Sequence, residues 1–225
     1  MRNLTFATLL LAIVAFGAFA QSTTDPADYF LQVRYAANLG LGESYINIVN
    51  TGASGNGPSL LGPGLGVQSG NICVNVYAFD PGEEMISCCS CYVTPDQVVN
   101  LGVNRDLTAK TLTGVIPTSV TVKLLMTLAG GDGTGGSSSC KNSAALSLGG
   151  SPSPNFDGGF GMAAWGTTLH SGPGGALATT ETPFTPAIPG DVVSLASRCA
   201  AIIGNASTFG ICNSCRAGAL GATKQ

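Results

Sequence analysis

Charged residues are scarce in this sequence: Asp, Glu, Lys and Arg make up only 9% of its 225 residues, against about 25% in ordinary globular domains. The formal net charge is −3, so the chain lacks the basic face that nucleic-acid binding requires. Hydrophobic residues reach 44%, too many for a disordered acidic tail. These values predict a folded protein with neutral polar surfaces and no nucleic-acid partner. Because soluble monomers normally carry more surface charge, they also favour burial of surface in an assembly.

Catalytic motifs are missing as well. His170 is the only histidine, so a histidine-rich metal site is excluded and a Ser-His-Asp triad would have to use this one residue. No Gly-x-Ser-x-Gly elbow is present. Glu83 and Glu84 are adjacent, whereas the paired carboxylates of glycosidases come from separate elements. We therefore expect a protein that is not an enzyme.

Only one hydrophobic run is long enough to notice, and it lies at residues 9–16. It is shorter than the ~20 residues that a membrane span needs. A basic start at Arg2 precedes it, and the small residues Ala18 and Ala20 follow it at the spacing that signal peptidase reads. Residues 1–20 are thus predicted to be a signal peptide, cleaved before Gln21. The mature protein is expected to be secreted or held at the cell surface, without a membrane span.

Cysteine is plentiful in comparison, because the chain holds eight. In an oxidising compartment an even number favours disulfides, and eight cysteines allow 105 connectivities, among which the sequence does not choose. Adjacent residues on a strand point to opposite faces, so the first two members of the Cys-Cys-x-Cys group should take different partners. A bridge from this group to the C-terminal cysteines would close a long loop. The cysteines are Cys73, Cys88, Cys89, Cys91, Cys140, Cys199, Cys212 and Cys215.

Two other uses of these cysteines stay open. The Cys88–Cys91 group together with Cys212 and Cys215 has thiolates enough for a zinc or iron–sulfur site. The pair Cys212 and Cys215 also has the spacing of a redox dithiol, although such pairs usually lie at a helix N-terminus and here the predicted helix comes first. Export favours structural disulfides over both.

The hydrophobic pattern predicts a mainly β protein, a β-sandwich-like domain with one C-terminal helix. The helix is expected over 191–203, with Asp191 as its N-cap, and residues 171–190 are expected to be loop. The Gly-rich segments 129–139 and 149–161 are predicted to be long loops, and the first offers an alternative boundary between two units. The predicted strands are 30–36, 43–50, 72–79, 84–89, 98–103, 119–126 and 161–170.

Two weaker motifs concern ions and sugars. Asp132 and Asp157 lie in Gly-rich loops and offer carboxylate ligands of the kind that calcium prefers, although neither loop matches an EF-hand. No other cofactor is expected. Asn205, Ala206 and Ser207 match the N-glycosylation sequon at the predicted end of the helix.

Several segments resemble a family of uncharacterised secreted cysteine-rich bacterial proteins, typified by acidobacteria. They are Phe79-Asp80-Pro81-Gly82-Glu83-Glu84, Ser87-Cys88-Cys89-Ser90-Cys91, Val93-Thr94-Pro95, Asp106-Leu107-Thr108, Thr111-Leu112-Thr113, Pro117-Thr118-Ser119-Val120 and the tail from Phe209 to Arg216. The similarity covers about half of the chain that follows the signal peptide. It implies an extracellular, disulfide-bonded protein and no catalytic residue. In general character the sequence is also similar to subunits of extracellular filaments.

Our first hypothesis for function is therefore a structural subunit of an extracellular filament, a homopolymer built by β-strand donation. Residues 21–36 are the expected donor, an extension ahead of a single β-rich domain over 37–225, with Phe30, Leu31, Val33 and Tyr35 as its assembly residues. On this hypothesis, removal of residues 21–36 would leave a folded core.

The alternative hypothesis is a monomeric secreted binding module for glycans or a surface partner. Tyr29, Tyr35, Tyr45 and Trp165 are the aromatic residues available to stack on sugar rings. Such residues more often fill a core, and that is the placement we expect for them.

Overall fold

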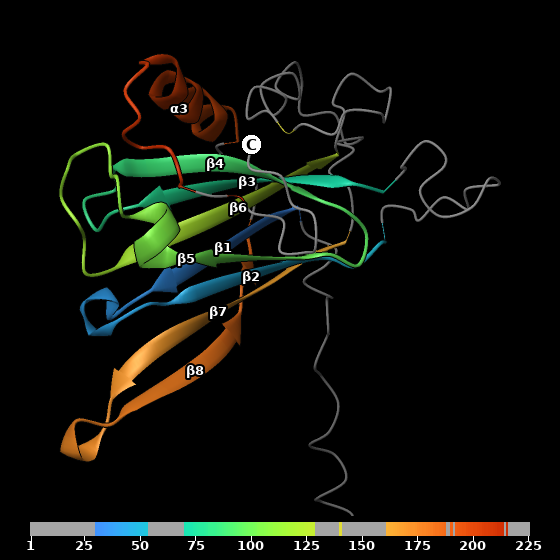
Figure 1. The fold of residues 1–225 in the computed structure, drawn as a ribbon. Helices are drawn as coiled ribbons and strands as arrows, with labels where there is room; N and C mark the ends of the chain where they lie inside the picture. The colour runs from blue at the N-terminus through green and yellow to red at the C-terminus, as the bar shows by residue number, and fades with distance from the viewer. Residues whose placement is uncertain are drawn as a thin grey trace, which may run out of the picture.

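The computed structural model describes residues 30–53, 70–128, 140, 161–187, 190, 192–213 and 215. Their strands form two antiparallel sheets that face each other as a sandwich (Figure 1). Sheet A contains, in spatial order, β4 (Met85–Val93), β3 (Ile72–Phe79), β6 (Val120–Leu128), β1 (Leu31–Ala36) and β9 (Thr185–Pro186). Sheet B contains β5 (Val98–Gly102), β2 (Tyr45–Asn50), β7 (Met162–Ser171) and β8 (Leu177–Pro183). The predicted fold class is confirmed.

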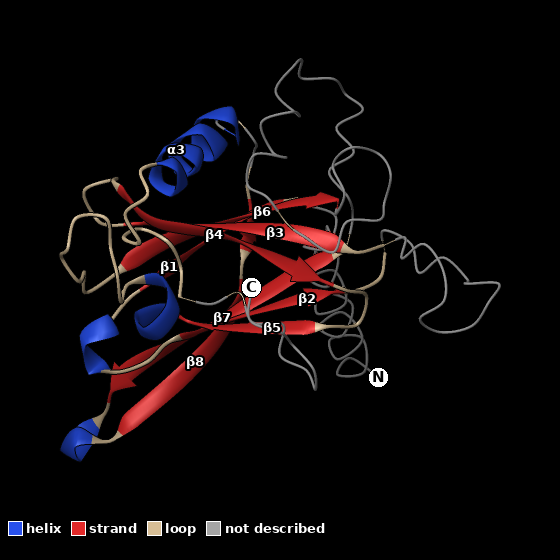
Figure 2. Cartoon of the chain, turned by 45° about the horizontal axis from the view of Figure 1, so that its top comes forward, coloured by secondary structure: helices blue, strands red, loops and turns tan. Residues whose placement is uncertain are grey.

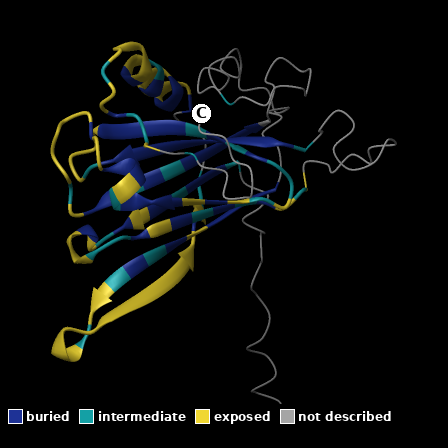
Figure 3. Ribbon diagram, in the orientation of Figure 1, coloured by how far each residue is buried: buried dark blue, intermediate teal, exposed yellow. Residues whose placement is uncertain are grey.

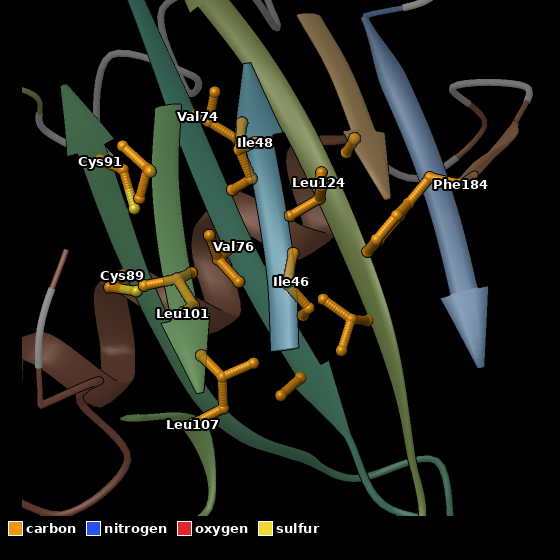
Figure 4. Packing of buried hydrophobic residues seen from close by; sticks show 14 of the residues in the cluster. Ile46, Ile48, Val74, Val76, Cys89, Cys91, Leu101, Leu107, Leu124 and Phe184 are labelled. Carbon is orange, nitrogen blue, oxygen red and sulfur yellow. The ribbon is translucent and has the colours of Figure 1, made fainter. Parts of the chain in front are cut away.

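The sandwich core follows from alternation along the strands. In β2, Ile46 and Ile48 are fully buried while Tyr45, Asn47 and Val49 face outward, as expected for a strand with one face on a core. Inward-pointing side chains from both sheets meet in one hydrophobic cluster (Figure 4). Its labelled members are Ile46, Ile48, Val74, Val76, Cys89, Cys91, Leu101, Leu107, Leu124 and Phe184.

The helix α3 (Val192–Gly204) covers the outer face of sheet A. Tyr77, Leu125 and Leu195 are among the side chains of a second hydrophobic cluster between the helix and the sheet, and Figure 2 shows α3 lying outside the sandwich. This cover explains why all eight residues of β3 are buried: one face of the strand meets sheet B and the other meets the helix. Burial also raises the pKa of the Tyr77 hydroxyl far above its ordinary value.

Four disulfides staple this arrangement, and three of them start on β4. Cys88, Cys89 and Cys91 are bonded to Cys199, Cys212 and Cys215 respectively, and Cys73 is bonded to Cys140. The expectation that Cys88 and Cys89 take different partners is confirmed, because Cys88 packs in the cluster under α3 and Cys89 packs in the sandwich core.

The C-terminal tail also seals the outer edge of β4 through its backbone. The N–H of Cys88 donates to Gly210 (2.9 Å), and the N–H of Cys212 donates back to Cys88 (3.2 Å). Gly210 has a φ of +77°, and a Cβ at this position would approach the side chain of Ile202. Glycine is therefore required where the tail leaves the helix and turns back onto β4.

The N-terminal strand is placed differently from our prediction. Residues 31–36 do not form a free extension: β1 pairs along its whole length with β6, from Leu31 opposite Leu125 to Ala36 opposite Val120. Leu31 is buried under α3, Phe30 packs against both clusters, and Val33 is partly buried. Removal of residues 21–36 would take an interior strand out of sheet A, so the expected folded core would not survive it.

Two further predictions are wrong. The segment 171–190 contains β8 and β9 rather than loop alone. The strand expected to end at 89 continues as β4 to Val93. The alternative division into two units also fails, because β7, which follows the Gly-rich segments, pairs with β2, which precedes them.

The remaining strands and the helix lie within two residues of their predicted bounds. Several predictions fall on residues outside the described ones, namely the signal peptide 1–20, the lead 21–29, Asp132, Asp157, the N-cap Asp191, the loop 129–139 and nearly all of 149–161.

Peptide mapping of the unreduced protein tests the bridges directly. We expect four linked pairs, with Cys88 joined to Cys199, Cys89 to Cys212, Cys91 to Cys215 and Cys73 to Cys140. A peptide holding a bond between Cys212 and Cys215 would contradict the structure.

The same bridges make a stability prediction. With its two neighbours intact, the Cys88–Cys199 bridge closes only a short additional loop, so C88A/C199A should lower the free energy of unfolding by about 3 kcal/mol. Chemical denaturation followed by circular dichroism measures this loss. No loss, or an unfolded variant, would contradict the expectation that the two neighbouring bridges hold the C-terminal segment on β4 without this one.

Candidate functional site

The strand β8, which forms a hairpin with β7, is the most exposed strand of the described chain. All seven residues of β8 are exposed, and Figure 3 shows the strand as a continuous exposed band on a hairpin that diverges from the sandwich. The ladder between β7 and β8 is regular, running from Trp165 opposite Pro183 to Ser171 opposite Leu177. At the tip, Gly174 and Gly175 have φ values of +71° and +80°, which glycine adopts without strain.

Sheet A ends before it can cover this hairpin. The last strand, β9, pairs with β1 only at Gln32 and Val33. Along Arg34–Ala36, β1 has no strand partner on that side among the described residues. The inner face of the hairpin therefore meets β1 at one end, and at the other end, where Ala178 and Thr180 lie exposed, no strand of the described residues opposes it.

Arg34 joins the hairpin to sheet A through side-chain hydrogen bonds. Its guanidinium donates to the hydroxyl of Thr168 (2.8 Å), the hydroxyl of Thr182 (3.2 Å) and the carbonyl of Thr167 (3.4 Å). The side chain lies against Gly166, where a Cβ would collide with it. Burial lowers the pKa of Arg34, and the charge of Glu181 opposes that shift. A single buried cation from sheet A thus holds both strands of the hairpin.

The outer edge of β8 has little of the protection that edge strands usually carry. Natural edges are blunted by lysines, prolines, bulges or inward-pointing charges. In β8 the only charge is Glu181, the only proline is Pro183 at the end of the strand, and the ladder with β7 shows no register shift. An unprotected strand of seven residues offers backbone hydrogen-bonding groups to another chain.

The aromatic residues named for glycan stacking are not in the core, so that expectation is wrong for three of the four. Tyr35 is 61% exposed, Trp165 38% and Tyr45 37%; Tyr29 lies outside the described residues. Tyr45 and Trp165 share the outer face of sheet B, on the neighbouring strands β2 and β7. Tyr35 lies on the outer face of sheet A, on the same side as Leu31.

The disulfide bonds bear on the two alternative roles of the cysteines, a metal site and a redox pair. The sulfurs of Cys89, Cys91 and Cys215 lie within 4.8 Å of one another, with 3.3 Å between those of Cys215 and Cys89. Each is half of a disulfide, so none is a thiolate in this state. Cys212 and Cys215 have different partners, so they are not bonded to each other as the alternative of a redox pair would require.

The other candidates are scattered. His170 is exposed on the hairpin, with Nε2 2.9 Å from the Thr180 hydroxyl. Glu83 and Glu84 are exposed at the turn between β3 and β4. Asn205 is exposed after α3, as expected for a sequon, and its side-chain oxygen accepts a hydrogen bond from the N–H of Ser207. Among the described residues, the histidine, the glutamate pair and the sequon therefore lie in separate places.

No protein-family model, curated protein or solved structure matches this chain. Among the described helices, none has both the length and the apolar character needed to cross a membrane. The disulfides are consistent with an extracellular protein. The exposed hairpin and the faces beside it are therefore the features that bear on function.

Replacing Arg34 tests the attachment of the hairpin. R34M keeps an unbranched apolar side chain but removes three hydrogen bonds from a charged donor, so we expect the free energy of unfolding to fall by about 2 kcal/mol. The matched control is R198M on the exposed side of α3, which should change it by less than about 0.5 kcal/mol. Equal stability of the two variants, measured by chemical denaturation, would contradict this role of Arg34.

Proposed function

We propose that this protein is a secreted structural subunit that associates with further copies of itself through the β7–β8 hairpin, forming an extracellular or cell-surface filament. The observation that carries the proposal is β8, a strand of seven residues exposed along its whole length. A strand in this position gains backbone hydrogen bonds along its open edge when a neighbouring chain pairs with it.

The location follows from a separate line of support. Four disulfides need an oxidising compartment to form and persist. The predicted signal peptide at residues 1–20 supplies a route to that compartment. Cross-links of this kind suit a subunit that stays folded outside the cell.

The strand that we expect to contact the neighbour differs from the one expected from the sequence. An N-terminal donor would have to be withdrawn from between β6 and β9, where β1 already pairs along all six residues. The edge of β8 needs no such rearrangement. We therefore assign the contact to the hairpin rather than to residues 21–36.

The sheet itself supplies geometry for an open polymer. Sheet B ends in β8 on one side and in β5 on the other. Pairing of β8 with the β5 edge of the next copy is a head-to-tail contact, which continues indefinitely unless the rotation closes a ring. Pairing of β8 with another β8 is self-complementary and stops at a dimer. Scarcity of charge favours either contact, because few like charges oppose association.

Lysines on the hairpin test the proposal. A178K/T180K places two charges on the exposed inner face of β8, the device by which natural edge strands resist pairing. We expect the mature wild-type protein to sediment as large species and to show filaments by negative-stain microscopy, and the variant to remain monomeric. The control S194K/S197K adds the same charge to exposed positions of α3 and should assemble like the wild type.

Two results would contradict the proposal. One is a wild-type protein that stays monomeric at high concentration over a range of salt and calcium concentrations. The other is a hairpin variant that assembles as well as the helix control, which would place the contact elsewhere on the molecule.

A further inference from the structure

The outer face of sheet B carries two exposed aromatic rings on neighbouring strands. Trp165 of β7 stands directly opposite Asn47 of β2, and Tyr45 lies two residues from Asn47 on the same face. Because diagonal neighbours on adjacent strands lie about 7–8 Å apart, the two rings stand on either side of one short stretch of sheet. Each remains more than a third exposed.

Polar side chains form a row across the sheet beside these rings. The side-chain N–H of Asn100 on β5 donates to the Asn47 oxygen (2.7 Å), and the N–H of Asn47 donates to the Glu181 carboxylate on β8 (3.3 Å). The hydroxyl of Thr167, on the Tyr45 side, accepts from the backbone N–H of Tyr45 (2.8 Å). These bonds hold the planar amide and carboxylate groups in fixed positions, facing solvent.

A pyranose ring matches such a surface chemically. Its C–H face is apolar and stacks on indole or phenol rings, while its hydroxyls both donate and accept hydrogen bonds in the plane around them. Amides and a carboxylate that are already oriented lose little side-chain entropy when they bind these hydroxyls. A purely apolar partner would instead bury the Asn100, Asn47 and Glu181 groups without replacing their bonds to water.

Charge and shape narrow the class of sugar. Among the residues of β5, β2, β7 and β8 whose side chains face outward, Glu181 is the one charged group and no lysine or arginine is present. The cation close to Tyr45 is Arg105, which is already paired with Asp106 (2.6 Å) and lies beside Glu43. An anionic polysaccharide would therefore meet no unpaired cation on these four strands and one carboxylate that repels it. The face is the open surface of a sheet, which suits an extended, flat chain with equatorial hydroxyls better than a compact one.

We propose that the outer face of sheet B binds neutral, extended polysaccharides of the β-1,4-linked pyranose class, with Trp165 and Tyr45 as stacking platforms and Asn47, Asn100 and Glu181 as hydrogen-bonding groups. This site does not depend on self-association. Pairing at the edge of β8 extends the sheet sideways and leaves its outer face open, so an assembled filament would repeat the site along its length.

Affinity electrophoresis of the full mature protein, kept as the dilute monomer, provides the test. The probes are hydroxyethyl cellulose, soluble β-1,4-xylan and glycol chitin as neutral or near-neutral β-1,4-linked chains, with polygalacturonate as the anionic comparison. We expect at least one of the first three to retard the wild type and polygalacturonate to leave it unchanged. W165A and Y45A should each weaken binding by about tenfold. The matched control is Y35A, which removes an exposed tyrosine from the other sheet and should bind like the wild type.

The sedimentation of each variant separates this proposal from the previous one. Loss of polysaccharide binding with assembly retained supports a sugar site. The inference is overturned if none of the three probes binds, if W165A binds like Y35A, or if polygalacturonate binds equally well. It is also overturned if W165A abolishes assembly, because the face would then be a contact between copies of this chain.

Discussion

Pairing between β1 and β6 determines how the rest of the molecule is arranged. All six residues of β1 are matched in register with β6, and the strand delivers Arg34 to the inner face of the hairpin, where it bonds to residues of β7 and β8. On its other side β1 is followed by only two paired residues of β9. Sheet A is therefore shorter than the hairpin that it faces, and most of β8 has no opposing strand among the described residues.

The two sheets end in very different edges. The outer edge of β4 is closed by the tail, which adds backbone hydrogen bonds at Cys88 and two disulfides, and a third disulfide joins β4 to α3. The outer edge of β8 has no such protection in the described residues. Because an unpaired edge is a site of pairing with other chains, this asymmetry gives the subunit a direction. In the proposed head-to-tail contact, copies join through the β8 and β5 edges of sheet B, while the β4 edge of sheet A is closed to pairing.

Much of the fold could be predicted from the sequence because burial leaves a periodic signal. The alternation of Ile46 and Ile48 with Tyr45 and Asn47 marked β2, and the β-branched run near 120–126 marked β6. The strand β8 was not predicted, and the reason is its exposure. Both of its faces are exposed, so it carries no hydrophobic alternation, and its threonines were the only signal of β structure.

The site was less predictable than the fold. Trp165 was expected in the core because large aromatic residues usually are buried, yet Ala164 and Gly166 on either side of it are the inward-facing residues. Gly166 has no room for a side chain because the Arg34 guanidinium occupies the space beside it. The pairing of residues 31–36 with β6 was missed for a different reason: a strand-like segment near a terminus has the same sequence pattern whether it pairs with its own chain or with another.

Hydrogen–deuterium exchange tests the central claim, that β8 is the contact between copies, most directly. Amides exchange slowly where hydrogen bonds persist, so peptides of the assembled protein can be compared with those of the dilute monomer. We expect the protection of backbone amides to rise on assembly across residues 177–183 and to stay unchanged in α3. Unchanged exchange at β8, with new protection elsewhere on the chain, would contradict it.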